Sequence, residues 1–175
     1  LAGFCRTIKR KFKKMIEKLL LQIQILQIQM QILLLQKKLT VPNLNDPRYI
    51  IIHHGAGQLN FEQVNEYHKG KWGFKSSLGY YIGYGYFISY SGRVYQGRAD
   101  NEEQAATIGY NKQSINICLQ GNFTSEQPTP AQMDALKKLV KEKKERYNIN
   151  IVNGHRNFSN TSCPGNNLYK LIINL

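Results

Sequence analysis

The sequence predicts an α/β fold, in which a mixed central β-sheet is flanked by helices and a long helix precedes this domain. Short runs of β-branched and aromatic residues, typical of buried strands, alternate with segments that have helix-capping residues and helical apolar spacing. The first 40 residues differ, because basic residues, Leu, Ile and Gln dominate them. We therefore divide the chain into a helical arm (1–40), a linker (41–47) and a folded domain (48–175).

The arm is expected to form a long helix. Its apolar residues recur at alternating spacings of four and three, the a/d pattern of a left-handed coiled coil. These residues are Phe12, Ile16, Leu19, Ile23, Leu26, Met30 and Leu33. Such a helix would self-associate through residues 12–33 or bind a partner helix. Five glutamines interrupt the apolar stretch 19–35 and argue against a membrane span. A helix on a membrane surface and, because Gln and Ile alternate, a β-strand stay open as alternatives.

The positive charge of the chain lies mainly in the arm. The formal net charge is +13, and the arm holds nine Lys or Arg against a single acidic residue, Glu17. A basic excess attracts polyanions, which include nucleic acid, anionic membranes and anionic cell-wall polymers. The chain has no nucleic-acid-binding motif, so we expect no nucleic-acid partner and favour wall polymers or a membrane surface.

The segment at 41–47 contains two prolines and three Asn or Asp residues, a composition typical of linkers. It has no convincing cleavage site for a signal peptide. The chain begins at Leu1 rather than Met, and we expect a fragment or a processed product.

The first half of the folded domain contains three predicted elements. Residues 49–54 are aromatic and β-branched, which predicts a buried strand that ends in His53 and His54. A helix is expected at 60–69, because a capping asparagine precedes apolar residues at helical spacing. Alternating residues around a Ser-Gly turn predict a β-hairpin at 83–97.

The second half adds a strand and a helix. Residues 114–119 form another apolar run typical of a strand. Thr129, Pro130 and Gln132 are an N-cap, a first-position proline and a capping-box residue, and they predict the start of a helix. Strands interspersed with such helices indicate the mixed sheet between helices.

A histidine and a cysteine suggest a metal site. His155 and Cys163 lie eight positions apart on an irregular loop. Imidazole nitrogen and thiolate sulfur are preferred zinc donors, and a catalytic zinc takes three protein ligands and leaves a fourth position for water. The strand end supplies a third ligand, His53 or His54. Each residue alone is more often structural, but three of the four histidines fall in these two segments, which favours a zinc site.

The three cysteines give a second argument for a ligand role. Cys5, Cys118 and Cys163 are an odd number with wide spacing, which argues against a disulfide-stapled scaffold. Cys163 is therefore free to bind metal. Cys118 lies inside an apolar strand, and we expect it to be inert core.

The motifs between Arg48 and Tyr169 resemble those of a known family. They stand in the order Ile51-Ile52-His53-His54, Ile82-Gly83-Tyr84-Gly85-Tyr86-Phe87, Gly92-Arg93-Val94-Tyr95-Gln96-Gly97-Arg98, Gly109-Tyr110-Asn111, Ser114-Ile115-Asn116-Ile117-Cys118-Leu119, Gly121-Asn122-Phe123, Pro128-Thr129-Pro130-Ala131-Gln132 and the loop from His155 to Cys163. The chain resembles the zinc-dependent N-acetylmuramoyl-L-alanine amidases of phage endolysins, bacterial autolysins and animal peptidoglycan recognition proteins.

The resemblance implies a set of site residues. Zn²⁺ would be held by His53, His155 and Cys163, and His54 would lie beside the ligands. Tyr84 would donate a hydrogen bond to the oxyanion of the reaction. Thr161 stands where some members have a catalytic lysine and others a threonine, and its neutral hydroxyl would contribute less than a cation.

Other residues bear on substrate binding. In some members a histidine near the position of His68 lines the substrate side, although packing is the commoner role for a histidine on a helix flank. The chain departs from the family at Gly55-Ala56-Gly57, where Thr or Ser is usual, and at Ala106, where many members have histidine. We expect these differences to affect substrate recognition more than metal binding.

By this resemblance the substrate is peptidoglycan, and a zinc-activated water would hydrolyse the amide bond between N-acetylmuramic acid and the L-alanine of the stem peptide. The protein would act at the bacterial cell wall, after secretion or after release from the host cytoplasm during phage lysis. A phage endolysin is favoured, since the domain lacks the cysteine pairs of secreted animal members.

Two alternatives remain. The first is a recognition module that binds peptidoglycan without hydrolysing it, as in members that lost the cysteine ligand; the presence of Cys163 argues against it. The second is a structural or phage assembly protein in which the coiled-coil arm carries the main function.

Overall fold

The structure is a computed structural model that describes residues 2–40 and 45–175, with side chains described for 10–34 and 45–175. The chain forms two compact units, residues 1–42 and 43–175. Most of the predicted linker, residues 41–44, lies outside the described residues.

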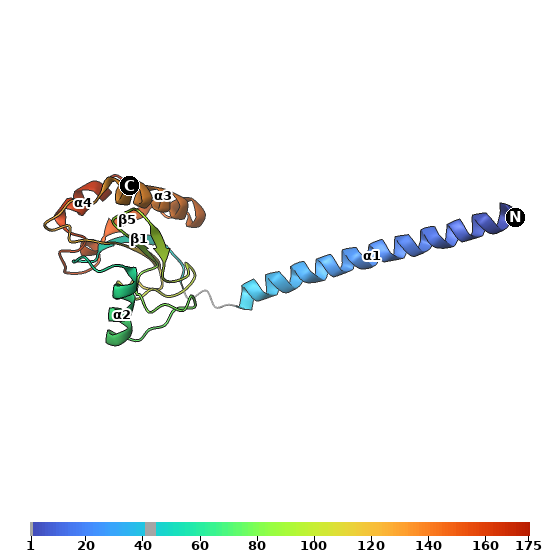
Figure 1. The fold of residues 1–175 in the computed structure, drawn as a ribbon, viewed down its shortest axis with the longest axis horizontal. Helices are drawn as coiled ribbons and strands as arrows, with labels where there is room; N and C mark the ends of the chain where they lie inside the picture. The colour runs from blue at the N-terminus through green and yellow to red at the C-terminus, as the bar shows by residue number, and fades with distance from the viewer. Residues whose placement is uncertain (1, 41–44) are drawn as a thin grey trace. The chain divides into compact units, whose positions relative to one another are not determined.

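The described residues of the first unit form one helix, α1 (Ala2–Thr40), drawn in blue in Figure 1. The predicted long helix is confirmed, and the alternative of a β-strand is wrong. The seven residues of the a/d pattern are exposed, by 43% at Ile16 to 64% at Met30 and Leu33. None of the described helices is both long enough and apolar enough to span a membrane.

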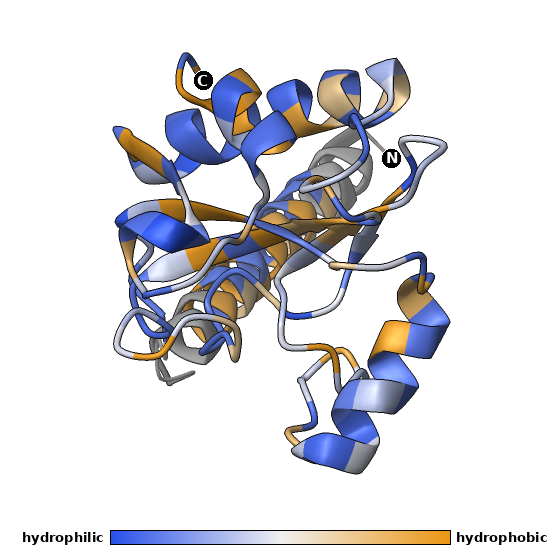
Figure 2. Ribbon diagram, turned by 90° about the vertical axis from the view of Figure 1, so that its left-hand side faces the viewer, coloured by the Kyte–Doolittle hydropathy of each residue, from blue (hydrophilic) through white to orange (hydrophobic). Residues whose placement is uncertain are grey.

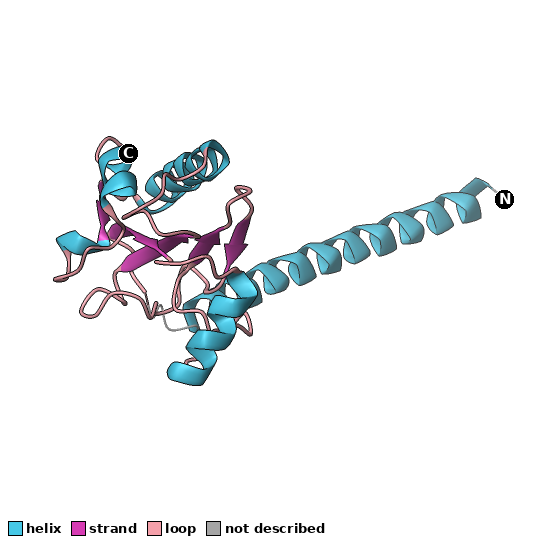
Figure 3. Cartoon of the chain, turned by 60° about the vertical axis from the view of Figure 1, so that its left-hand side comes forward, coloured by secondary structure: helices cyan, strands magenta, loops and turns pink. Residues whose placement is uncertain are grey.

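The second unit is built on a five-stranded mixed sheet (Figure 3). Its strands are β1 (Tyr49–His54), β2 (Tyr86–Ile88), β3 (Val94–Gln96), β4 (Ser114–Leu119) and β5 (Ile151–Gly154), in the order β3-β2-β4-β1-β5. The strands β2, β4, β1 and β5 are parallel, and only β3 is antiparallel, because it closes the predicted hairpin with β2. The predicted fold class is confirmed.

Helices cover both faces of this sheet, with α3 (Pro130–Tyr147) and α4 (Asn166–Ile172) on one face and α2 (Phe61–Lys71) on the other (Figure 1). Both predicted N-caps form, and each is part of a capping box. The side chain of Asn60 accepts from the backbone N–H of Gln63 at the start of α2, and the side chain of Thr129 accepts from the backbone N–H of Gln132 at the start of α3. The cap residues thus fix where each helix begins, as the sequence predicts.

Two apolar layers follow from the alternation of side chains along the strands. Ile50 and Ile52 of β1 pack with residues of α3 and α4 in the larger core. Phe87 and Cys118 point to the opposite face, where they pack against the start of α2. The strands between these layers are mainly apolar, as the orange colour in Figure 2 shows. His53 lies on the α2 face, and His54 lies on the face of α3 and α4.

Candidate metal centre

The parallel pairing of β1 with β5 brings two histidines together. Ile52 pairs with Gly154 in the register of these strands, so His53 and His155 follow at the carboxyl ends of neighbouring strands. Their ring centroids lie 4.6 Å apart. His155 begins a short 3-10 helix, η1 (His155–Asn157), directly after β5.

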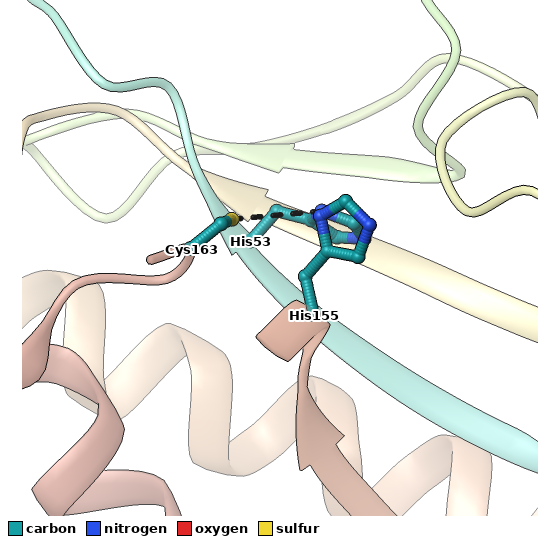
Figure 4. A group of neighbouring side chains, drawn as sticks. All are labelled: His53, His155 and Cys163. Atoms are coloured by element: carbon teal, nitrogen blue, oxygen red, sulfur yellow. Dashed lines mark hydrogen bonds between the residues drawn. The ribbon is translucent and has the colours of Figure 1, made fainter. Parts of the chain in front are cut away.

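Cys163 completes the cluster from the loop before α4. Ligand atoms of His53, His155 and Cys163 all lie within 4.8 Å of one another. His53 Nδ1 lies 3.8 Å from Cys163 Sγ, the contact dashed in Figure 4, where the three side chains converge. The three residues that the resemblance names as ligands are therefore neighbours in the fold.

The backbone at the end of β1 also contacts the sulfur. The N–H of His54 donates to Cys163 Sγ at 3.4 Å, while the His54 ring accepts from Phe123 N at 3.2 Å on the other face of the sheet. The position of the sulfur is thus coupled to that of β1. His54 contributes its backbone to the site, and its ring points away.

Tight packing holds the loop that carries His155 and Cys163. A Cβ atom at Gly154 would lie 2.6 Å from Pro164 Cδ, so the end of β5 contacts the loop closely. At Gly165 the backbone has a φ of +86°, and a Cβ atom there would overlap the backbone carbonyl group of Phe123. Glycine is needed at Gly165 because other residues rarely adopt a positive φ.

Burial controls the protonation of the three candidate ligands. It lowers the pKa of His53 to about 3, with a further lowering by the charge of His155. It also lowers the pKa of His155. Burial raises the pKa of the Cys163 thiol to about 11, although the His54 N–H and the positive charge of Arg156 oppose this rise. At neutral pH the cluster therefore consists of two neutral imidazoles and a protonated thiol.

These donors fit a zinc ion. Two neutral imidazole nitrogens and one sulfur match the borderline-soft character of Zn²⁺, and three protein ligands leave a fourth position for water or substrate. His155 is only partly buried, whereas His53 and Cys163 are buried. The positive charge of Arg156 favours the thiolate form of Cys163, and the thiol would release its proton to solvent when the sulfur binds a cation.

Tyr84 lies beside the cluster. Its ring centroid is 5.2 Å from that of His53 and 5.7 Å from that of His68. Burial raises the pKa of the Tyr84 phenol well above its usual value, and the neighbouring Cys118 and Cys163 raise it further. The phenol therefore stays protonated and can donate a hydrogen bond near the cluster. Cys118, which we expected to be inert core, is fully buried beside this phenol.

The other two residues singled out from the sequence support the backbone. Thr161 is exposed, and its Oγ1 accepts from Cys163 N at 3.2 Å, so it helps to shape the loop. His68 is 6% exposed, and its Nδ1 accepts from Gly83 N at 2.9 Å. His68 thus holds the segment that carries Tyr84.

Two residues of the site were missed by sequence reasoning. Asn116 Oδ1 lies 2.7 Å from His53 Nε2, and Thr107 Oγ1 donates to the same Oδ1 at 2.8 Å. Asn116 is a polar residue inside an apolar strand, and asparagine is depleted in strands. An asparagine inside an apolar strand is therefore a sequence signal that could have singled out Asn116. Thr107 had none, because it lies in an irregular segment.

Comparisons with known proteins agree with this geometry. Residues 43–166 match the family model Amidase_2, described as N-acetylmuramoyl-L-alanine amidase. Peptidoglycan-recognition protein SC2 of Drosophila melanogaster is 32% identical over 136 residues, 71% of each chain. Among solved structures, the N-acetylmuramoyl-L-alanine amidase LysC of Clostridium intestinale is 32% identical with a TM-score of 0.65, over 71% of this chain and 80% of that one.

A further similar solved structure contains a bound ligand. It is the complex of tracheal cytotoxin with the ectodomains of peptidoglycan recognition proteins LCa and LCx. Its matching chain is 32% identical with a TM-score of 0.64, over 74% of the present chain and 82% of its own. The similar proteins thus include both an amidase and recognition proteins.

Proposed function

The chain belongs to the Amidase_2 family of N-acetylmuramoyl-L-alanine amidases, and on this basis we propose that it is a zinc-dependent peptidoglycan amidase. Its relatives include recognition proteins and amidases, so membership supports binding or cleavage of peptidoglycan. The choice of cleavage rests on one observation, the convergence of His53, His155 and Cys163 within 4.8 Å.

The proposed substrate bond joins the lactyl carbonyl of N-acetylmuramic acid to the amino group of L-alanine. Hydrolysis adds the oxygen of water to the carbonyl carbon and breaks the C–N bond. The products are a lactyl carboxylate and a free α-amino group, which takes up a proton. A zinc ion held by the three ligands would supply Lewis-acid chemistry, by lowering the pKa of water and polarising the carbonyl.

The residues around the cluster have separate roles in this proposal. Tyr84 donates a hydrogen bond from its phenol to the oxygen on which negative charge develops. The raised pKa of the phenol keeps it protonated, so that it does not transfer its proton. Thr161 offers a weaker neutral hydroxyl, and it orders the loop through its bond from Cys163 N. His68 positions the Tyr84 segment through Gly83.

The test uses the full chain and two cysteine variants. Bound zinc is measured by elemental analysis, and release of stem peptide from purified peptidoglycan is assayed by mass spectrometry. We expect about one zinc per chain and peptide release for the wild type, and neither for Cys163→Ser. Cys118→Ala is the matched control, since it removes a buried thiol that is not a proposed ligand, and it should retain zinc. A wild type free of zinc, or a Cys163→Ser variant with full activity, would overturn the proposal.

A recognition module without activity is the second candidate, and the similarity to recognition proteins favours considering it. Sedimentation with insoluble peptidoglycan separates the two functions. A wild type that sediments with peptidoglycan but releases no peptide would be a recognition module. We expect sedimentation together with release, and hence action at the bacterial cell wall, as a secreted protein or a phage endolysin.

The arm at 1–40 is proposed to bring the domain at 48–175 to anionic wall polymers or to a membrane surface. Five basic residues near its start are exposed: Arg10, Lys11, Lys13, Lys14 and Lys18. Attraction between exposed charges weakens with salt. Binding to walls that carry anionic polymers should therefore weaken as the ionic strength rises. The alternative role of the arm, self-association through residues 12–33, would be detected by sedimentation equilibrium.

A further inference from the structure

Asn116 is a buried amide in an otherwise apolar strand. It lies in β4 between Ile115 and Ile117, and all three residues are fully buried. A buried amide costs stability unless its hydrogen-bonding groups have partners. In this structure both ends of the amide are paired: Oδ1 faces His53 Nε2 at 2.7 Å, and Nδ2 donates to Ser114 Oγ at 2.8 Å.

The hydrogen bonds around Asn116 have a fixed direction. Ser114 Oγ donates its only proton to the carbonyl of Tyr110 at 2.7 Å, since a carbonyl can only accept. Ser114 Oγ must then accept from Asn116, which assigns the amide nitrogen to this side. The amide oxygen, Oδ1, therefore lies on the opposite side, where it also accepts a hydrogen bond from Thr107 Oγ1 at 2.8 Å. Asn116 therefore presents an acceptor to His53.

An acceptor at this place decides the tautomer of the imidazole. Neutral histidine carries one proton, on either Nδ1 or Nε2. Because Asn116 Oδ1 accepts at 2.7 Å, the proton belongs on His53 Nε2. The hydroxyl of Thr107 lies 3.4 Å from the same nitrogen, farther than its 2.8 Å from Oδ1. His53 Nδ1 keeps its lone pair, and this nitrogen faces Cys163 Sγ.

We propose that Asn116 is a positioning residue of the metal centre, which fixes His53 in the tautomer and ring orientation that leave Nδ1 free to bind a metal ion. The inference rests on the proposed function, because it requires a metal at His53. The hydrogen-bond chain runs from the Tyr110 carbonyl through Ser114 and Asn116 to His53. The segment with Tyr110 thus contributes to metal binding without contacting the metal.

Three variants test the inference. Asn116→Leu has a similar volume and no acceptor, Asn116→Asp keeps an acceptor, and Gln132→Leu is the matched control. Gln132 is also a fully buried amide, and it donates to Gln120 O over a distance of 2.8 Å. Gln132 is not part of the metal cluster. Zinc affinity is measured by competition with a chelator. The tautomer of His53 is read in metal-free protein at pH 7.5 from the ring ¹⁵N chemical shifts.

We expect the proton on Nε2 in the wild type and in Asn116→Asp. The carboxylate of Asn116→Asp also adds a negative charge beside His53, so its zinc affinity should be at least that of the wild type. Asn116→Leu should show a mixture of tautomers and a loss of zinc affinity of about 10- to 100-fold, the usual effect of removing a group that orients a ligand. Gln132→Leu should lose stability without a change in tautomer or affinity. A purely structural role of Asn116 would make Asn116→Leu behave like Gln132→Leu.

The outcomes separate this inference from the proposed function. A wild type that binds no zinc overturns the proposed function, while the ¹⁵N shifts still test the relation between Asn116 and His53. A proton on Nδ1 in the metal-free wild type overturns the inference even if Asn116→Leu fails to fold. Zinc binding that is unchanged in a folded Asn116→Leu also overturns it and leaves the proposed function intact.

Discussion

The backbone N–H of Arg156 donates to the carbonyl of Cys163 at 2.9 Å, so the chain itself closes the loop between His155 and Cys163. The guanidinium of Arg156 strengthens the closure, because it donates to Ser162 O and, at 2.7 Å, to Asn166 Oδ1. Two of the three proposed ligands are therefore held in place by protein contacts. Such preorganisation lowers the ordering cost of binding a metal.

Replacement of Gly165 by alanine should loosen this loop. Gly165→Ala adds a strained positive φ and an overlap with the backbone of Phe123, which together cost about 2–5 kcal/mol of unfolding free energy. Urea denaturation followed by circular dichroism measures the loss. Gly109→Ala is the control, since Gly109 has a φ of +83° and nothing within 4 Å of the added Cβ. It should cost only about 1–2 kcal/mol, and equal losses would contradict the packing argument.

Removal of the Tyr84 hydroxyl should slow hydrolysis without releasing the metal. We expect Tyr84→Phe to lower kcat by about 100- to 1000-fold, the usual effect of losing one donor to an oxyanion, with bound zinc unchanged. Tyr86→Phe makes the same chemical change on the other face of the sheet, where the Tyr86 hydroxyl donates to Asp100 Oδ1 at 2.7 Å. It should cost stability and spare kcat. Full activity of Tyr84→Phe would remove the phenol from the mechanism.

Zinc binding should release about one proton at pH 7.5. The pKa of Cys163 is about 11 in the metal-free protein, so the thiol carries a proton that must leave when the sulfur binds metal. The pKa of His53 is about 3, and that of His155 is also lowered, so both rings are already neutral. Affinity should thus rise about tenfold per pH unit between pH 7 and 9. Calorimetry in buffers of different ionisation enthalpy counts the protons, and a count near zero would refute the protonated thiol.

Acid should destabilise the metal-free protein partly through His68. Burial, with smaller effects of the charges on Lys71 and Arg98, lowers its folded-state pKa from 6.5 to about 4. As pH falls, the unfolded chain therefore binds this proton first. The contribution of neutral His68 is fully present above pH 6.5 and is lost between pH 6.5 and 4. Urea denaturation across this range should give a shallower pH dependence for His68→Gln than for wild type, and parallel curves would contradict the burial effect.

Local sequence signals predicted the elements that have strong local chemistry. The caps at Asn60 and Thr129 form as expected, because a cap involves residues only three positions apart. The strand β5 and the helix α4 were not predicted. The four residues of β5 have no clear alternation, and α4 starts without a side-chain cap at Gly165. Their positions depend on contacts with β1 and the core, which no local pattern encodes.

In the candidate site, too, the residues with distinctive local chemistry could be predicted, and the contacts that depend on the fold could not. His53, His155 and Cys163 could be named because their chemistry and motifs are distinctive, and the fold brings them together. The bonds from Asn116 and Thr107 could not be predicted, since they depend on the register of β4 against β1 and on the path of an irregular segment.

The outermost position of β5 has a consequence for how long the protein would retain a metal. Within the part of the chain that the structure describes, β5 pairs with β1 alone, and Ile151 at its start is 44% exposed. Edge elements open locally at a lower free energy than the core. Opening of β5 would carry away His155 and the loop with Cys163, leaving His53 alone on an inner strand. The residence time of the ion would then be set by fraying of one sheet edge, well before the domain unfolds, and a bound ion would in turn suppress that fraying.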